Sequence, residues 1–161
     1  AGHGDSSETE LVNAVSRSGD FQEAVGGPFI YILIVNAATL LFWKQNLVGV
    51  MAVSIMAAGD GMADLVGRRY GKNNKWFFSK SKSIAGSAAF VAAGALCAFG
   101  LAIWLSTTGS LTLPAQFGLW SLFLRIFGIT TACAFVELLP IGDDNWTVPI
   151  TAAILSAVLL Q

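Results

Sequence analysis

The hydrophobic positions of this chain gather into long runs separated by short polar segments, a pattern that predicts helices crossing a lipid bilayer. The first run opens with a proline and carries an aromatic residue near each end, which is typical of a membrane-spanning helix. A Lys-Gln-Asn turn separates it from the second run. The runs cover residues 28–43, 47–58, 83–106, 117–139 and 146–160.

The second run has only 12 apolar residues (47–58), too few for the ~20 that a membrane span needs. It reaches that length only if the helix continues through the sequence GDGMADLVGRRYG, residues 59–71. We therefore predict one long helix that carries Asp60 and Asp64 towards the membrane–water interface.

Composition supports a membrane protein. Hydrophobic residues make up 55% of the 161 positions, charged residues only 12%, and the mean hydropathy is +0.67. An average soluble domain has about 25% charged residues. The fold class we expect is all-α, an integral membrane bundle of about five transmembrane helices, with the bilayer and no nucleic acid as its partner. We expect residues 1–27 to be polar and disordered, and residues 28–161 to form the membrane domain of a longer protein. Cys97 and Cys133 lie in apolar runs and are expected to pack without a disulfide.

The net charge of −1 conceals a strong segregation of charge along the chain. Six of the nine Lys and Arg residues fall between residues 60 and 82, and an excess of Lys and Arg predicts the cytoplasmic or equivalent face of the membrane. Counting crossings from this segment places residues 141–145 on the same face. Residues 1–27 return to that face as well, because the first two runs form an out-and-back pair. We therefore predict that both acidic clusters meet the cations on one side of the bilayer.

The most informative segment is residues 59–71. On a helix, Asp60, Asp64 and Arg68 share one face, and two carboxylates one turn apart can hold Mg²⁺ together with substrate phosphates. Ionisable groups at the end of an apolar run favour a functional site. The alternative is a solvated helix end with an Asp–Arg pair. The glycines of the segment can expose backbone N–H groups to an anion or allow close helix packing, and their spacing matches neither common nucleotide fingerprint. These glycines are Gly59, Gly61, Gly67 and Gly71.

A basic tract follows, with an aromatic wedge, residues 76–78, that we place at the level of the lipid headgroups. Its cations could attract anionic lipids or cradle a triphosphate, and both roles are compatible. The cradle is favoured by SKSKSIAGS, residues 79–87, where Ser83 and Gly86 stand at a predicted helix start that could bind phosphate. The cations of the tract are Arg68, Arg69, Lys72, Lys75, Lys80 and Lys82.

A second acidic group follows the fourth run. Glu137 ends that run, and Asp143 and Asp144 form a turn before Trp146. One of these acids could contact a metal or act as general base towards a substrate hydroxyl. The alternative for the aspartates is an ordinary helix N-cap. Arg125, near the other end of the run, is expected to snorkel or to pack between helices.

These motifs, in this order, resemble the polyprenol kinase family, in particular its phytol kinase and farnesol kinase branch in plants and algae. The resemblance rests on GDGMADLVGRRYG, SKSKSIAGS, VELLP and DDNWTVP and covers about residues 27–161. It implies a multi-span enzyme that transfers phosphate, with Mg²⁺, from CTP to an isoprenoid alcohol in a plastid membrane, serving tocopherol synthesis. The acidic positions that match are Asp60, Asp64, Glu137, Asp143 and Asp144. The matching basic and backbone positions are Arg68, Arg69, Lys80, Lys82, Gly59, Gly61, Gly67 and Gly86.

Two other functions are compatible with parts of the sequence. A membrane cytidylyltransferase of the phosphatidate type is similar around an Asp–Gly–Lys core, but the C-terminal histidine pattern of those enzymes is absent here. A non-enzymatic membrane protein with a lipid-binding basic loop would bind no nucleotide. The sequence chooses neither among phytol, geranylgeraniol and farnesol nor among CTP, UTP and ATP, and the oligomeric state is not predicted.

Overall fold

The computed structural model describes residues 32–33, 35–37, 40, 46–79, 81–139 and 144–161. The predicted polar segment 1–27 and most of the first apolar run lie outside these residues, as do Lys80 and Asp143. The chain divides into two compact units, Ala1–Ile34 and Val35–Gln161. Every candidate site residue belongs to the second unit, whose described residues form helices and no named strand, so the all-α prediction is confirmed.

The second apolar run and the following motif form one continuous helix of 27 residues, Leu47–Asn73, as predicted. Asn46 caps its start by accepting a hydrogen bond from the backbone N–H of Val48 at 3.1 Å. Within this helix the backbone conformation changes three times. It consists of α3 (Leu47–Ser54), the π-helical turn η1 (Ile55–Asp60), α4 (Gly61–Tyr70) and a final 3₁₀ turn η2 (Gly71–Asn73).

Three further helices follow, and their bounds agree with the hydrophobic runs to within about two residues. They are α5 (Ile84–Thr107), α6 (Leu119–Leu138) and α7 (Asp144–Leu159). The long helix, α5 and α6 are long and apolar enough to span a membrane. With 16 residues, α7 is about 24 Å long, somewhat short of a ~30 Å hydrocarbon core.

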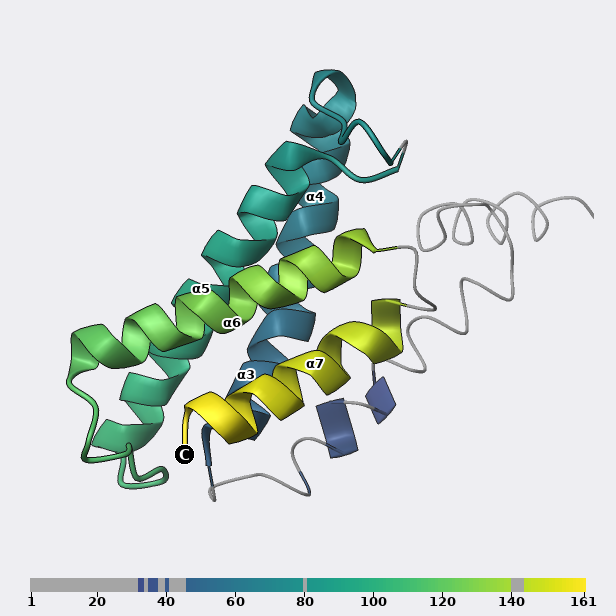
Figure 1. Ribbon diagram of the computed structural model, residues 1–161. Helices are drawn as coiled ribbons and strands as arrows, with labels where there is room; N and C mark the ends of the chain where they lie inside the picture. The colour runs from purple at the N-terminus through teal and green to yellow at the C-terminus, as the bar shows by residue number, and fades with distance from the viewer. Residues whose placement is uncertain (1–31, 34, 38–39, 41–45, 80, 140–143) are drawn as a thin grey trace, which may run out of the picture. The chain divides into compact units, whose positions relative to one another are not determined.

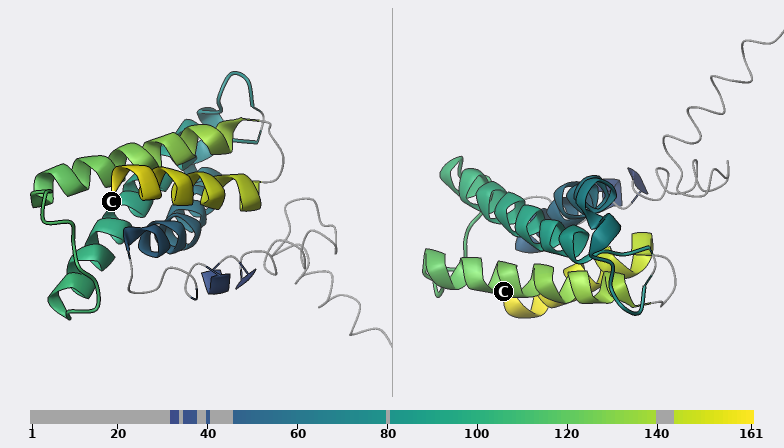
Figure 2. Two further views of the ribbon diagram at one scale, coloured as in Figure 1. Left: turned by 60° about the horizontal axis from the view of Figure 1, so that its bottom comes forward. Right: turned by 90° about the horizontal axis from the view of Figure 1, so that it is seen from above.

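Small residues allow these helices to pack closely. The long helix packs on α5, α5 also contacts α6, and α6 runs beside α7 (Figures 1 and 2). A side chain at Gly94 of α5 would meet the Thr130 methyl at 3.5 Å and the Gly59 Cα at 3.7 Å. Close approach of backbones at small residues is the usual packing mode between membrane helices.

The outward surface of the bundle is rich in large apolar side chains. Leu96 of α5, Phe135 of α6 and Val158 of α7 are 65%, 62% and 72% exposed. Soluble proteins rarely expose so much apolar surface, whereas lipid solvates it without cost. Arg125 also behaves as predicted, since its Nη1 donates to the Leu159 carbonyl at 2.9 Å and holds the end of α7 on α6.

Candidate active site

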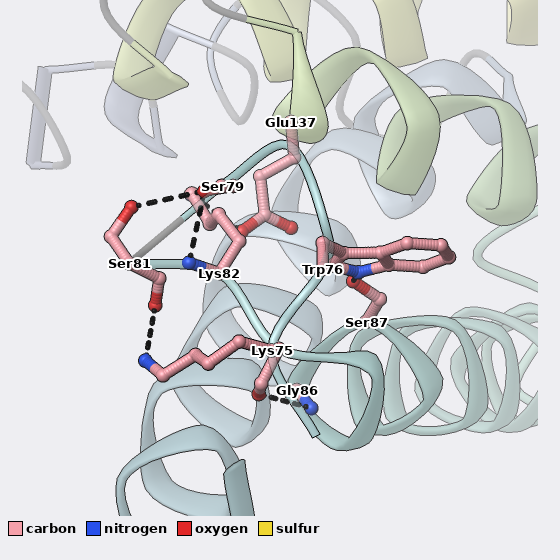
Figure 3. A network of polar contacts seen from close by, with 9 residues as sticks. Lys75, Trp76, Ser79, Ser81, Lys82, Gly86, Ser87 and Glu137 are labelled. Atoms are coloured by element: carbon pink, nitrogen blue, oxygen red, sulfur yellow. Dashed lines mark hydrogen bonds and ion pairs between the residues drawn. The ribbon is translucent and has the colours of Figure 1, made fainter. Parts of the chain in front are cut away.

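The segment between η2 and α5, residues 74–83, is called here the basic loop, and it folds back on itself as a narrow hairpin. The Trp76 N–H donates to the Lys82 carbonyl at 3.2 Å, and Lys75 and Ser83 form an isolated antiparallel bridge. The Lys75 ammonium reaches across to the Ser81 carbonyl at 3.1 Å (Figure 3). These bonds fix the loop against the start of α5 and set the direction in which Lys82 points.

An ion pair connects the basic loop to the far end of α6. Lys82 Nζ lies 2.8 Å from Glu137 Oε1, although the two residues are 55 positions apart in sequence. Both side chains are largely buried, with 17% and 7% exposure. Two charges are removed from water only at a cost, so this contact is a strong constraint on structure. The predicted convergence of the cations with the acidic end of the fourth run is thereby confirmed for Lys82 and Glu137, and Asp143 lies outside the described residues.

The first acidic pair lies near the middle of the long helix. Asp60 is the last residue of η1 and is half-buried, and Asp64 stands one turn later in α4. The Arg68 Nε lies 2.9 Å from Asp64, with both groups partly exposed, so the Asp–Arg pair of the alternative interpretation is present. Short π-helical turns are rare and frequently occur at functional sites. The turn also shifts the face of α4 relative to α3, which the apolar pattern alone did not reveal.

The carboxylates fit a magnesium ion in number and kind. Mg²⁺ typically takes one or two carboxylates and completes its shell with water and phosphate oxygens, so Asp60 and Asp64 suffice. Arg68 is already bound to Asp64 and would have to share that carboxylate. No cluster of three or more acidic, histidine or cysteine side chains is found among the described residues.

Most of the glycines predicted to contact phosphate lie instead where two helices meet. A Cβ on Gly86 would lie 3.0 Å from the Ala63 carbonyl and 3.5 Å from the Gly67 Cα. A Cβ on Gly59 would lie 3.5 Å from Phe90 of α5. Gly61, by contrast, has open space around it. Packing therefore explains the glycine at Gly86, whereas a side chain at Gly59 or Gly67 would make only ordinary contacts, and the contact of all four glycines with phosphate stays a prediction.

The start of α5 is capped by the protein itself. Ser83 accepts the Gly86 N–H at 3.1 Å, and the Ile84 N–H donates to the Asn74 carbonyl at 2.9 Å. The predicted helix start at Ser83 is confirmed, but these two N–H groups are not available to bind phosphate. Arg69 lies over the Tyr70 ring, 5.7 Å from its centroid. Asp144 begins α7.

The sequence predicted that the cations and the end of the fourth run share one face, but not that Lys82 pairs with Glu137. It also gave no signal for an apolar groove of about 240 Å³ between α5 and α6. Trp76 closes the groove at the basic loop, where its indole N–H donates to the Ser87 hydroxyl at 3.1 Å. The adjacent Phe77 is 96% exposed, in agreement with an aromatic wedge at the interface.

Comparison with known proteins agrees with the resemblance in the motifs. No family model matches the chain, and no solved structure does. Several curated plant proteins do match. The chain is 38% identical over 152 residues to a probable phytol kinase 3, chloroplastic, of Glycine max, covering 92% of this chain and 46% of that protein. It is 35% identical over 146 residues to the farnesol kinase, chloroplastic, of Arabidopsis thaliana, covering 89% and 46%. By sequence, the chain is similar to part of these plant phytol and farnesol kinases.

The match extends along nearly the whole chain but only part of each relative. The chain spans about half the length of the curated relatives it matches. These phytol and farnesol kinases are named chloroplastic, and the chain has three membrane-length apolar helices. Together these findings agree with the predicted plastid membrane protein.

Proposed function

We propose that this chain forms part of a CTP-dependent kinase that phosphorylates the hydroxyl of a long-chain isoprenoid alcohol at the surface of a plastid membrane. Phytol is the expected substrate, with farnesol and geranylgeraniol as related ones, and the product would feed tocopherol-type prenyl lipid synthesis. The observation that carries the proposal is the Lys82–Glu137 ion pair, which joins a cationic loop to an acidic helix end. The names of the relatives supply the reaction class.

The different solubilities of the two substrates require a site at the surface of the membrane. An isoprenoid tail partitions into the hydrocarbon core, whereas a nucleoside triphosphate stays in water. The hydroxyl and the γ-phosphate can therefore meet only at the interface. Lys82 lies just before the start of α5 and Glu137 near the end of α6, which is the depth at which this meeting would occur, and Asp60 follows the apolar first part of the long helix.

The roles follow from phosphoryl-transfer chemistry, in which catalysis is mostly positioning and neutralisation of charge. Asp60 and Asp64 would hold Mg²⁺ on the triphosphate, and the ion would supply charge neutralisation there. Arg68, Arg69, Lys80 and Lys82 would surround the phosphates. Asp143, Asp144 or Glu137 would orient or deprotonate the alcohol.

Product analysis tests the reaction class. Membranes containing the protein are incubated with Mg²⁺, a panel of prenols and CTP labelled at either the α- or the γ-phosphate. Transfer of the γ-label to an alkyl monophosphate, with CDP released, is the expected result. Pyrophosphate with an α-labelled CDP-lipid would instead identify a cytidylyltransferase, and no nucleotide binding at all would favour a non-enzymatic membrane protein. Parallel reactions with UTP and ATP decide the donor.

The metal assignment makes a separate prediction. Asp60→Asn keeps the size of the side chain but removes the charge, so turnover should fall by about 100-fold or more, because metal stabilisation is worth several kcal/mol. Arg125→Gln, remote from the basic loop, is the matched control and should retain turnover. Activity is measured across a Mg²⁺ titration, with thermal stability in detergent recorded for each variant. Undiminished turnover in Asp60→Asn would remove the metal role.

A further inference from the structure

The groove between α5 and α6 ends at the basic loop, close to the Lys82–Glu137 ion pair. Side chains on successive turns of α5 and α6 form the two walls of the groove. Leu138, one of the lining residues, directly follows Glu137 in the sequence. Trp76 lines the same end and is bonded through its backbone to Lys82. In Figure 3 the Glu137 carboxylate points from α6 towards the loop, between Lys82 and Trp76. Glu137 is not itself a lining residue, but its buried carboxylate lies next to the end of the groove that Trp76 and Leu138 form. The side walls consist mainly of Ile84, Ala88, Val91, Thr131, Ala134 and Phe135.

One atom of this arrangement lacks a partner. Glu137 Oε1 accepts the Lys82 ammonium, but Glu137 Oε2 makes no hydrogen bond within the part of the chain that the structure describes, although it is buried. A buried carboxylate oxygen without a donor is costly and uncommon in native proteins. A ligand with a hydroxyl group would satisfy it, and an alcohol is such a ligand.

Building on the proposed function, we propose that the groove holds the isoprenoid chain of the substrate alcohol and that Glu137 is the residue that accepts its hydroxyl proton. The groove is the right environment for a hydrocarbon, since the Thr131 hydroxyl is turned back to the Phe127 carbonyl at 2.7 Å and Ser87 is bonded to Trp76. Its polar groups are thus satisfied by the protein. Of the acids left open above, this assigns the base to Glu137.

The size of the groove predicts how the chain is recognised. Its volume of about 240 Å³ is below the ~300–1,000 Å³ of pockets that enclose a drug-sized ligand. From Ile84 to Val91 it follows α5 for about 10 Å, a third of the hydrocarbon core. Only the part of the chain nearest the hydroxyl fits, and the remainder extends into lipid. The site therefore distinguishes prenols by their first branched units and only weakly by total length.

The chemical step is then a direct transfer. A lone pair of the alcohol oxygen forms the new O–P bond to the γ-phosphorus, while the bond from that phosphorus to the β,γ-bridging oxygen breaks and its electron pair leaves with the nucleoside diphosphate. The hydroxyl proton passes to Glu137 Oε2 and from there to solvent. The Lys82 ammonium holds the carboxylate in position through Oε1.

Two variants with a matched control test the groove by kinetics. Ala88→Trp fills the groove and should raise KM for the prenol by about tenfold or more while leaving KM for the nucleotide unchanged. Ala92→Trp places the same side chain one turn further along α5, outside the lining, and should behave as wild type. Glu137→Gln should lower kcat by about 100-fold or more with little change in KM for the prenol. Farnesol and phytol, supplied at equal mole fraction in vesicles, should give similar KM values.

A binding experiment separates this inference from the proposed function. A prenol carrying a diazirine near its hydroxyl end is photolysed in membranes with the wild type and with the Trp variants, and the labelled peptide is identified. Labelling within residues 84–91 or 131–138, lost in Ala88→Trp and kept in Ala92→Trp, is the expected result. Labelling elsewhere, or Glu137→Gln turning over like wild type, would overturn the inference while the kinase activity stands. If wild type phosphorylates no prenol, the proposed function fails, and the photolabelling still decides whether the groove binds the alcohol.

Discussion

At the scale of single residues, the candidate glycines fall into two groups. Some lie where two helices approach each other, and one has no neighbouring side chain or backbone within contact distance. Gly67, Gly71 and Gly86 lie where α4 and its 3₁₀ end approach the start of α5. The sequence allowed either packing or phosphate binding at these positions, because both need a residue without a side chain. Only the three-dimensional neighbours distinguish the two, and they favour packing.

Gly71 and Gly61 provide a matched test of that distinction. A Cβ on Gly71 would lie 2.6 Å from the Ser83 Cβ, so Gly71→Ala should destabilise the protein by about 1–3 kcal/mol through overpacking. Gly61 is exposed in α4 with open space around it, so Gly61→Ala should be neutral or stabilising by up to about 1 kcal/mol. Thermal unfolding in detergent measures both. Equal stability of the two variants would contradict the packing role of Gly71.

Activity of the same pair carries separate information. If Gly61→Ala is fully stable but loses turnover, Gly61 serves the nucleotide rather than the fold. That outcome would support the predicted phosphate contact at Gly61, where packing does not explain the glycine.

At the scale of elements, the sequence was informative where the local physics is simple. The long apolar runs predicted α5 and α6. Because the run 47–58 is too short to span a membrane by itself, it predicted that the helix continues into α4. The π-helical turn Ile55–Asp60 was not predictable, because nothing in the composition of IMAAGD distinguishes it from an α-helix. The hairpin of the basic loop was also missed, since its bonds join backbone groups that carry no residue-specific pattern.

The contribution of the contact between the basic loop and α6 to the free energy of unfolding can be measured. Lys82→Met leaves the Glu137 carboxylate buried without its cation, so the protein should lose about 2–3 kcal/mol, less than the ~3–5 kcal/mol of a fully buried pair. Lys75→Met is the control from the same loop, where an exposed ammonium loses one bond to the Ser81 carbonyl, and should cost under about 1 kcal/mol. Unfolding in detergent at fixed pH and salt is the measurement. A similar small loss in both variants would show that the Lys82–Glu137 contact contributes little.

At the scale of the whole molecule, topology was the most useful prediction from sequence. Counting crossings placed the ends of distant segments on one face without any knowledge of contacts, and the Lys82–Glu137 pair joins two of those ends. What the count could not supply is which side chains touch. It placed residues 141–145 on this face, and among the acids whose side chains the structure describes it is the buried Glu137 that meets the basic loop.

The shared face is open to a direct test by cysteine labelling. In a background where Cys97 and Cys133 are replaced by alanine, single cysteines are introduced at Lys72 before the basic loop, at Leu139 after α6 and at Thr108 between α5 and α6. All three positions are exposed. A membrane-impermeant maleimide applied to sealed vesicles should label Lys72→Cys and Leu139→Cys from the same side, and Thr108→Cys only from the other, because each span reverses the side.

Permeabilised vesicles, in which all three cysteines should react, control for local accessibility. The experiment is decisive because the proposed chemistry needs the triphosphate, the hydroxyl and their ligands in one aqueous compartment. Labelling of Leu139→Cys together with Thr108→Cys would place Glu137 across the bilayer from the cations of the basic loop. Neither the kinase site nor the alcohol groove could then assemble as described.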